Sequence, residues 1–387
     1  MRNRFPFFKN NPELIYLDSA ATSQTLDTVI EDTSDFLINH KSNAHRSGHS
    51  MGAWVDKKYY EAKSKIGTWL DIDNPFNRIV FNSGASQSLY DAIQLIGKKY
   101  THFKVIVGED FHHSMLLPFR NLNCDIEYVK ITAEGNLDYD MLEQMLYASN
   151  SVPVVLALSA VGNVLGRSID LDRIRSLADA HNAVTLIDAC QSIGKIEHNY
   201  NDFDFVAWSW HKVYGPMGLG CLLIDEKWLE LDPIHPGGGS VTHVDTHTQT
   251  YLNTATKFES GTQNLQAIVA LPRLLDWLID NQSSILTHDK MLVDIANKLC
   301  KHKVCPTETG LISFCINVGS VEDFTMLLDA KNICVRGGKL CAEPLVNSIS
   351  ATGSLLRVSW GAYTTKQELE VAFEEIERVH ERISRYV

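Results

Sequence analysis

From residue 78 to residue 225, short apolar segments rich in β-branched residues alternate with segments of helical periodicity. The apolar segments are RIVFNSG, KVIVGED, DIEYVK, VPVVLALSA, AVTLIDA, FDFVAWS and GCLLID. Helical segments such as SQSLYDAIQLIGKK and DLDRIRSLADAHN lie between them. This alternation is typical of a mostly parallel sheet with helices on both faces. The sequence therefore predicts an α/β protein built on a sheet of seven strands.

The remaining chain contains a loop, a long helix and a second unit. Residues 236–262 are rich in glycine and threonine and lack strong periodicity, which indicates a long functional loop. The segment LQAIVALPRLLDWLID predicts a long helix, and LISFCINV, TMLLDAKN, ICVRGG, LLRVSWG and a final amphipathic helix follow it. We therefore expect a large domain over residues 15–265. Residues 266–387, together with 1–14, are expected to form a small α+β domain.

Charge and cysteine usage exclude several classes of protein. The formal net charge of −12 argues against nucleic acid or an anionic membrane as the main partner. No apolar run reaches membrane-spanning length, and the first residues lack the apolar core of a secretory signal. The eight cysteines are scattered, with no CxxC pair and no metal-ligand spacing. This pattern favours reduced thiols in the cytoplasm and predicts no metal site.

Polar side chains follow several of the predicted strands, at the edge where α/β sheets bind ligands. The strand RIVFN leads to Ser83-Gly84-Ala85-Ser86, which could hold a phosphate or could simply cap a helix. The strand KVIVGED leads to His112-His113. AVTLIDA ends near Asp188, with Gln191 three residues later, and a buried carboxylate needs a partner such as a protonated pyridine nitrogen.

One lysine stands between an apolar strand and a Gly-Pro turn. The strand FVAWS leads to Ser209, His211 and Lys212. A partly buried lysine is suited to forming a Schiff base, although this stretch alone equally fits a surface lysine. A phosphate cup, an imidazole, an acid and a Schiff-base lysine in this order along one sheet together predict a pyridoxal phosphate site.

These residues resemble those of fold-type I pyridoxal phosphate-dependent enzymes of the class V aminotransferase-like group. The chain is most similar to the cysteine desulfurases of the SUF type (group II), from 16-YLDSAAT-22 and 45-HRSGH-49 to 355-LLRVSWGAY-363. The resemblance implies a homodimer with a shared active site. It also implies that L-cysteine, or L-selenocysteine, is the substrate, and that a sulfur-acceptor protein is a partner.

The resemblance assigns a role to each residue of the cofactor site. Lys212 matches the lysine that carries the cofactor, Asp188 matches the ligand of the ring nitrogen and Gln191 matches the ligand of the phenolic oxygen. His112 matches the imidazole that stacks on the ring and is counted with the catalytic residues. The phosphate-binding positions are Ala85, Ser86, Ser209, His211 and, from the neighbouring subunit, Thr262.

The resemblance also implies how the substrate is held and where its sulfur goes. Asn163 and Arg357 match substrate ligands, with Arg357 on the carboxylate. Arg336 and Cys341 match the arginine and the nucleophilic cysteine of the stretch R-x-G-x-x-C-A-x-P. L-cysteine would become L-alanine, and Cys341 would keep the sulfur as a persulfide for iron–sulfur cluster assembly or other sulfur metabolism. The other seven cysteines are interpreted as structural.

The chain departs from the family pattern at three places. Ala85 replaces one of two hydroxyl residues in the phosphate turn, Phe111 stands where a glutamate is usual, and Lys339-Leu340 replace a common histidine pair. These departures bear on substrate identity and turnover more than on cofactor binding.

Two alternatives to a desulfurase remain open. A related lyase that cleaves the C–S or C–Se bond of cystine or selenocysteine could do without Cys341. A catalytically idle scaffold is the other alternative, and the intact Lys212, Asp188 and Arg357 argue against it.

Overall fold

The computed structural model describes residues 1–45, 47–149 and 152–385. Its main feature is a seven-stranded sheet in the order β2-β8-β7-β6-β5-β3-β4. The strands are β2 (Ile79–Asn82), β3 (Phe103–Gly108), β4 (Cys124–Val129), β5 (Val154–Ser159), β6 (Val184–Asp188), β7 (Phe205–Ser209) and β8 (Gly220–Ile224). In this sheet β8 alone runs in the direction opposite to the other six strands. The predicted mostly parallel sheet of seven strands is therefore confirmed.

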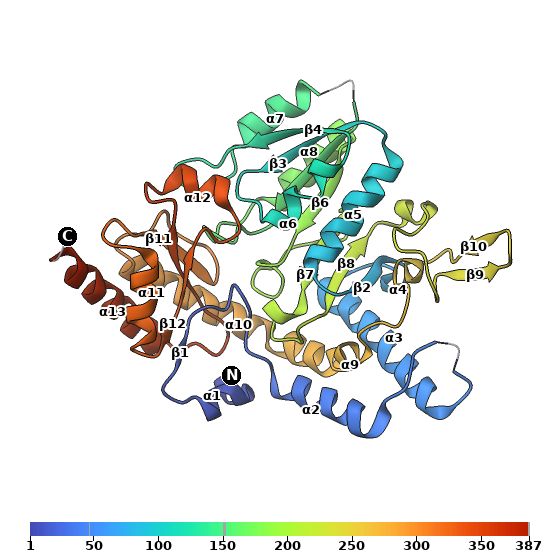
Figure 1. Ribbon diagram of the computed structural model, residues 1–387, viewed down its shortest axis with the longest axis horizontal. Coiled ribbons are helices and arrows are strands. Elements are labelled where there is room, and N and C mark those ends of the chain that lie inside the picture. Colours follow the sequence, from blue (N-terminus) through green and yellow to red (C-terminus); the bar gives the residue numbers. More distant parts are fainter. Residues whose placement is uncertain (46, 150–151, 386–387) are drawn as a thin grey trace.

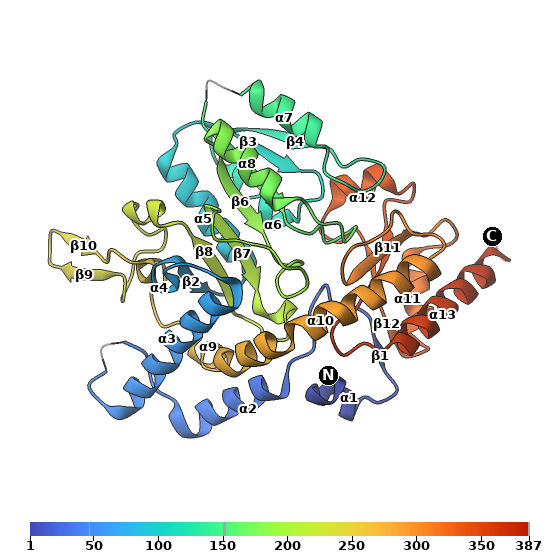
Figure 2. The ribbon, with the colours of Figure 1, turned by 180° about the vertical axis from the view of Figure 1, so that it is seen from behind.

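Helices cover both faces of this sheet (Figures 1 and 2). They are α3 (Ser50–Leu70), α5 (Ala85–Lys99), α6 (His113–Leu116), α7 (Tyr139–Tyr147) and α8 (Leu171–His181). Successive side chains of a strand point to opposite faces. In β7, Phe205 and Ala207 join one hydrophobic core with α5, whereas Val206 and Trp208 join another with α3 and α8. Burial on both faces explains why these strands read as continuous apolar runs.

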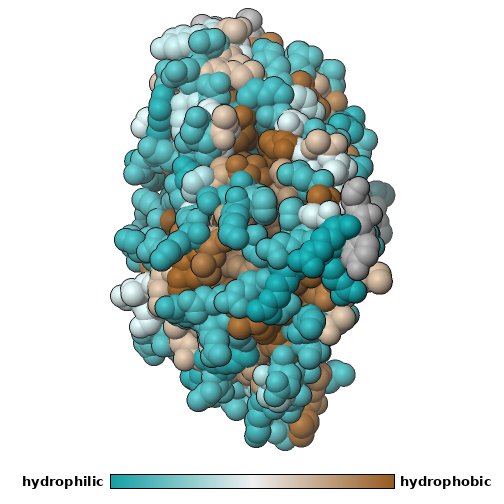
Figure 3. All heavy atoms as spheres, turned by 90° about the vertical axis from the view of Figure 1, so that its left-hand side faces the viewer, coloured by the Kyte–Doolittle hydropathy of each residue, from teal (hydrophilic) through white to brown (hydrophobic). Residues whose placement is uncertain are grey.

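A smaller sheet lies beyond the long helix α10 (Leu271–Leu299), which runs from the large sheet towards it (Figure 2). Its order is β11 (Leu311–Cys315), β14 (Leu355–Ser359), β13 (Arg336–Gly338). Close by, β1 (Ile15–Tyr16) pairs with β12 (Ile333–Cys334). A separate core contains side chains of this sheet, α10, α11 (Val321–Asp329) and α13 (Lys366–Ser384). The surface at this end is mostly hydrophilic, with hydrophobic side chains between (Figure 3). The domain boundary at residue 265 stays a prediction.

Shorter elements connect these parts. They are η1 (Arg2–Arg4), α1 (Pro6–Asn10), α2 (Asp27–Asp35), η2 (Phe36–His40), α4 (Pro75–Arg78), η3 (Phe119–Asn121), η4 (Trp210–Lys212), η5 (Glu226–Glu230), η6 (Ala255–Phe258), α9 (Leu265–Ile268) and α12 (Glu343–Ile349). In the part of the chain that the structure describes, no helix combines the length and the apolar character needed to cross a bilayer.

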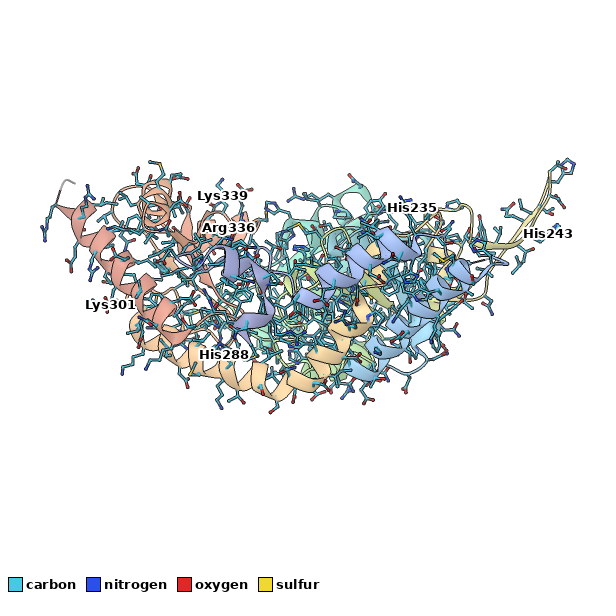
Figure 4. All side chains as sticks on the ribbon, turned by 90° about the horizontal axis from the view of Figure 1, so that it is seen from below. His235, His243, His288, Lys301, Arg336 and Lys339 are labelled. Atoms are coloured by element: carbon cyan, nitrogen blue, oxygen red, sulfur yellow. The ribbon has the colours of Figure 1, made fainter. Side chains whose placement is uncertain are left out.

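The expected loop at 236–262 contains a β-hairpin, which the sequence did not reveal. Its strands, β9 (Val241–Val244) and β10 (Gln249–Tyr251), project from the body of the molecule (Figures 1 and 4). The Asp245 carboxylate accepts the backbone N–H groups of His247 and Thr248 at 2.7 Å and so closes the turn. Because both strands are short and largely exposed, they carry no apolar alternation that would identify them.

Candidate active site

A cavity of about 230 Å³ opens at the carboxyl edge of the large sheet. The parallel strands end at this edge, so residues that are far apart in sequence meet there. The lining residues are Ala85, Ser86, Leu89, His112, Ser114, Ser159, Val161, Asn163, Asp188, Cys190, Gln191, Ser209, His211 and Lys212. Most of the predicted cofactor ligands thus surround one cavity. Thr262, Arg336, Cys341 and Arg357 are not among its lining residues.

One end of the cavity is formed by the N-terminus of α5. The Ala85 N–H donates to Ser209 Oγ at 2.8 Å, which leaves the Ser209 hydroxyl proton available to a ligand. Ser86 Oγ lies 2.7 Å from Ser114 Oγ. β8 passes so close that a Cβ on Gly220 would lie 2.4 Å from the backbone of the turn before α5, which is why glycine stands there. Hydroxyls gathered at a helix N-terminus are suited to binding a phosphate.

Burial favours the neutral form of both histidines of the cavity. His112 Nδ1 accepts the Ser114 N–H at 3.2 Å, so the proton of the neutral ring is on Nε2. Burial lowers the pKa of His112. His211 Nδ1 lies 3.2 Å from Thr22 Oγ1, and burial together with the charge of Lys212 lowers the pKa of His211 to about 4. A neutral imidazole is suited to stacking on an aromatic ring without adding charge.

Asp188 and Gln191 lie on the turn after β6. The buried carboxylate of Asp188 accepts the Cys190 N–H through Oδ1 at 2.9 Å. The Gln191 amide donates to the Ala20 carbonyl at 2.8 Å, and its Oε1 accepts from Lys195 Nζ at 2.8 Å. Because Lys195 donates to the amide oxygen and Ala20 accepts one amide N–H, the second N–H of Gln191 is the group left for a ligand. Sequence analysis did not identify Lys195, because its contact with the amide of Gln191 depends on how the chain turns after β6.

The amine of Lys212 is available for chemistry. Lys212 follows β7 in the short helix η4, and its Nζ has neither a hydrogen bond nor an ion pair with any described residue. Its positive charge is felt by neighbouring groups, since it lowers the pKa of His112 and His211. A lysine that lines a cavity without a counter-ion is suited to reaction with an aldehyde.

The cavity fits pyridoxal phosphate by its donor and acceptor groups. Hydroxyls and the α5 N-terminus suit the phosphate, and the Asp188 carboxylate suits a protonated ring nitrogen. The neutral His112 ring suits the face of the pyridine, and the Lys212 amine suits the aldehyde. Ala85 offers only its methyl group, so the phosphate end has one hydroxyl fewer than the family pattern.

The segment that carries Cys341 is tied to the cavity by its backbone. Asn163 Nδ2, which belongs to the cavity lining, donates to the Leu340 carbonyl at 2.8 Å. The His113 N–H donates to the Cys341 carbonyl at 3.0 Å. Leu340 and Cys341 both have φ of 54°, a conformation that costs energy for residues other than glycine. Among the described cysteines Cys341 alone is exposed, while four others are buried and three half-buried.

Arg357 carries a buried guanidinium next to this segment. It lies in β14 with 3% of its surface exposed, and Nη1 donates to the Asn163 carbonyl at 2.8 Å. Burial lowers the pKa of Arg357 to about 10. Its Nε is buried with no hydrogen-bond partner among the described residues. An unpaired buried donor is costly, so this atom is suited to an anionic ligand such as a carboxylate.

Thr262 lies away from the cavity, in an anchored segment. Its Oγ1 is 3.4 Å from Asn43 Nδ2. Three residues earlier, Glu259 pairs with Lys63 at 2.8 Å, with both side chains 1% exposed, and accepts the Phe81 N–H at 2.9 Å. The segment before Thr262 is therefore anchored to β2, and Thr262 itself does not line the cavity that contains Lys212. Arg46 of the HRSGH stretch lies outside the described residues.

Comparison with known proteins identifies the family. The family model for class-V aminotransferases matches residues 15–371. The chain belongs to this family. The chain is 30% identical to a probable cysteine desulfurase of Pseudomonas aeruginosa over 383 residues, covering 94% of this chain and 93% of that protein. It is 28% identical to a probable cysteine desulfurase of Halalkalibacterium halodurans, covering 96% and 94%.

Solved structures of similar proteins agree with the fold. The cysteine desulfurase CsdA from Escherichia coli superposes with a TM-score of 0.88 at 26% identity, covering 99% of this chain and 98% of that one. The apo cysteine desulfurase of Thermococcus onnurineus gives a TM-score of 0.90 at 26% identity, covering 98% and 97%. The fold-type I prediction is therefore confirmed. The cofactor of this class-V aminotransferase family member is pyridoxal phosphate.

A buried carboxyl lies behind the cavity. Asp110 follows β3 and is packed between Gly108 and Gly162, where a Cβ would lie 3.0 Å and 2.4 Å from its oxygens. Burial, together with the nearby charges of Asp188 and Glu109, raises the pKa of Asp110 to about 7. The folded protein therefore binds a proton here that the unfolded chain releases near pH 4.

Replacing Asp110 by asparagine is expected to remove this pH dependence. The unfolding free energy of the wild type should fall as pH rises from about 4 to about 7, because the folded state retains the proton. Asparagine keeps the shape and cannot ionise, so the variant should be more stable at pH 8 by about 1–3 kcal/mol and nearly equal at pH 4. Urea unfolding at both pH values measures the difference. An equal difference at the two pH values would contradict the expectation.

Proposed function

We propose that this protein is a pyridoxal phosphate-dependent cysteine desulfurase of the SUF type. It converts L-cysteine into L-alanine, keeps the sulfur as a persulfide on Cys341 and passes it to an acceptor protein. The observation that carries the proposal is the position of Cys341: its thiol is exposed, while its backbone is hydrogen-bonded beside the cavity that Lys212 lines. The similarity to cysteine desulfurases over nearly the whole chain supports the same reaction.

The cofactor is assigned to residues of the cavity. Ser86, Ser209 and His211 bind the phosphate, and Lys212 holds the cofactor covalently. Asp188 pairs with the ring nitrogen, His112 stacks on the ring and Gln191 donates its N–H to the phenolic oxygen. The hydrogen bonds of Ser209, His112, Asp188 and Gln191 support these roles, because they leave each of these four groups with the donor or acceptor that its role requires.

The substrate is assigned to the side of the cavity near the small sheet. Arg357 binds its carboxylate, and the unpaired Nε supports this role. Asn163 contacts both this arginine and the Cys341 segment, so it fixes the position of that segment relative to the proposed substrate site. Bound pyridoxal phosphate supplies an electron-accepting ring that stabilises negative charge at the substrate Cα. Once the substrate amine has displaced it from the cofactor, the free Lys212 amine would take the Cα proton and would later return a proton to the product.

Cys341 performs the sulfur transfer. Its thiolate attacks the sulfur of the substrate, so that a sulfur–sulfur bond forms while the Cβ–sulfur bond breaks. Cβ receives the electron pair of the broken bond and is then protonated, which yields alanine. The overall equation balances, because L-cysteine and the thiol of Cys341 give L-alanine and the persulfide. A reducing thiol or the acceptor protein then removes the outer sulfur and regenerates the enzyme.

Alanine release from L-cysteine tests the proposal. With L-cysteine alone, alanine should appear in a single burst of about one equivalent per site and then slowly. Addition of a thiol reductant or an acceptor should restore continuous turnover. A lyase acting on selenocysteine or cystine would release its product at the same rate with and without reductant, and that result would replace the desulfurase assignment.

The destination of the sulfur is iron–sulfur cluster assembly or other sulfur metabolism in the cytoplasm. The exposed thiol supports transfer to a protein, since an acceptor must approach it closely. The cysteine composition supports a reducing compartment.

A homodimer with a shared active site is part of the proposal. Thr262 would bind the phosphate of the neighbouring subunit, which agrees with its absence from the lining of the cavity of its own chain. Next to it lies a surface cavity of about 610 Å³ lined partly by Phe36 and Leu37 of η2, and the adjacent Ile38 is 78% exposed. Apolar side chains gathered on a surface indicate a contact with another chain.

Sedimentation measurements test this arrangement. The wild type should sediment as a dimer, and Ile38→Asp should weaken it and lower the activity by about 10-fold or more, because a charge would be buried at the contact. Met326→Asp is the matched control, since Met326 is 70% exposed on the distant helix α11. A fully active monomer would rule out the shared site.

A further inference from the structure

Two arginines face each other on neighbouring strands of the small sheet. Arg336 in β13 and Arg357 in β14 are direct partners in the antiparallel register. Like charges directly opposite each other destabilise a sheet. Arg336 also lies on the segment that leads to Cys341, and Figure 4 shows Arg336 and Lys339 on the same side of the molecule. An anion is therefore needed between them.

Asp18 supplies that anion from the N-terminal part of the chain. Its carboxylate accepts from Arg336 Nη2 at 2.8 Å through Oδ2, and from Arg336 Nε at 3.0 Å through Oδ1 and 3.1 Å through Oδ2. The same carboxylate is 3.5 Å from Nη2 of Arg357. Asp18 is held in place by a β-bridge to Ser359, at the end of β14. One carboxylate thus joins two guanidinium groups, and one positive charge remains uncompensated.

The remaining charge lies next to Cys341. Arg357 donates to the carbonyl of Asn163, whose amide binds the carbonyl of Leu340 directly before Cys341, and Arg336 precedes Cys341 by five residues on the same segment. The other nearby cations are balanced differently: Lys339 pairs with Glu343, and His113 lies 3.7 Å from the same carboxylate. The arginine pair with Asp18 therefore determines the net charge beside the thiol.

We propose that Asp18 is a positioning residue that holds Arg336 and Arg357 together and sets the net positive charge beside Cys341. Its negative charge offsets one of the two arginine charges, while its contact with Nη2 fixes the guanidinium of Arg357, whose buried Nε has no partner among the described residues. The importance of this charge for catalysis rests on the proposed role of Cys341 as the acceptor of the substrate sulfur.

The test compares two substitutions that break the same ion pair with opposite changes of charge. Asp18→Asn removes a negative charge and Arg336→Gln removes a positive charge, and the double variant restores the net charge. The readout is the rate at which iodoacetamide alkylates Cys341 at pH 7, quantified for the Cys341 peptide by mass spectrometry. Only the thiolate reacts, so the rate follows the local charge. This readout needs no turnover, so it is independent of the desulfurase assignment.

We expect alkylation of Cys341 to be about 3-fold faster in Asp18→Asn and about 3-fold slower in Arg336→Gln, with the double variant near the wild type. A purely structural role predicts that both single variants change in the same direction and that the double variant changes further. That result, or no change at all, would overturn the proposal. If Asp18→Asn folds only in combination with Arg336→Gln, the counter-ion role is supported. If neither protein folds, Asp18 has another structural role and the proposal fails.

Discussion

Replacing Lys212 by alanine is expected to abolish both the covalent attachment of the cofactor and the formation of alanine. The visible absorption of the bound cofactor should disappear or shift, because no other described amine lines the cavity. Activity should fall by at least about 10³-fold, since the same Nζ is the proposed base for the Cα proton. Absorption spectra and an alanine assay on the purified variant measure the two effects.

Lys195 provides the matched control for Lys212. Its Nζ lies 2.8 Å from Gln191 Oε1, and burial lowers the pKa of Lys195 to about 8, so it is the second amine near the site. Lys195→Ala should retain the covalently bound cofactor and change only its affinity or spectrum. Reduction of the wild type with borohydride, followed by peptide mapping, should label Lys212. A label on Lys195 or any other lysine would refute the assignment.

Replacing Cys341 by alanine should separate cofactor chemistry from sulfur transfer. The variant should bind the cofactor and change its spectrum when L-cysteine is added, because the thiol takes part in neither step. Persulfide formation and sulfur transfer should fall by about 10³-fold or more, since the other described cysteines are buried or half-buried. Cys334→Ala is the control, because Cys334 lies in the same region on β12 and is half-buried. Wild-type alanine release by Cys341→Ala would favour the lyase.

The large sheet could be predicted because its strands are buried on both faces and therefore read as continuous apolar runs. The cavity could be predicted in outline for a related reason, since the polar residues after these strands meet at one edge of the sheet. The hairpin of β9 and β10 was missed because its short, exposed strands have no apolar face. Local periodicity carries information only where an element packs against a core.

The contacts that orient the site residues could not be predicted. Asp18 reaches Arg336 across more than three hundred residues of sequence, and Lys195 reaches Gln191 only through the shape of the turn after β6. The burial of Asp110 between two glycines likewise depends on how β3 and β5 pack. Such contacts leave no spacing or composition signal, so they emerge only when the chain is folded.

The most direct test of the account is the chemical state of Cys341 after one turnover. The purified protein would be incubated with one equivalent of L-cysteine, alkylated and digested, and the Cys341 peptide weighed by mass spectrometry while alanine is measured in parallel. The account predicts that the peptide gains one sulfur atom in an amount equal to the alanine released. Alanine accompanied by free sulfide, with Cys341 unmodified throughout the time course, would contradict it.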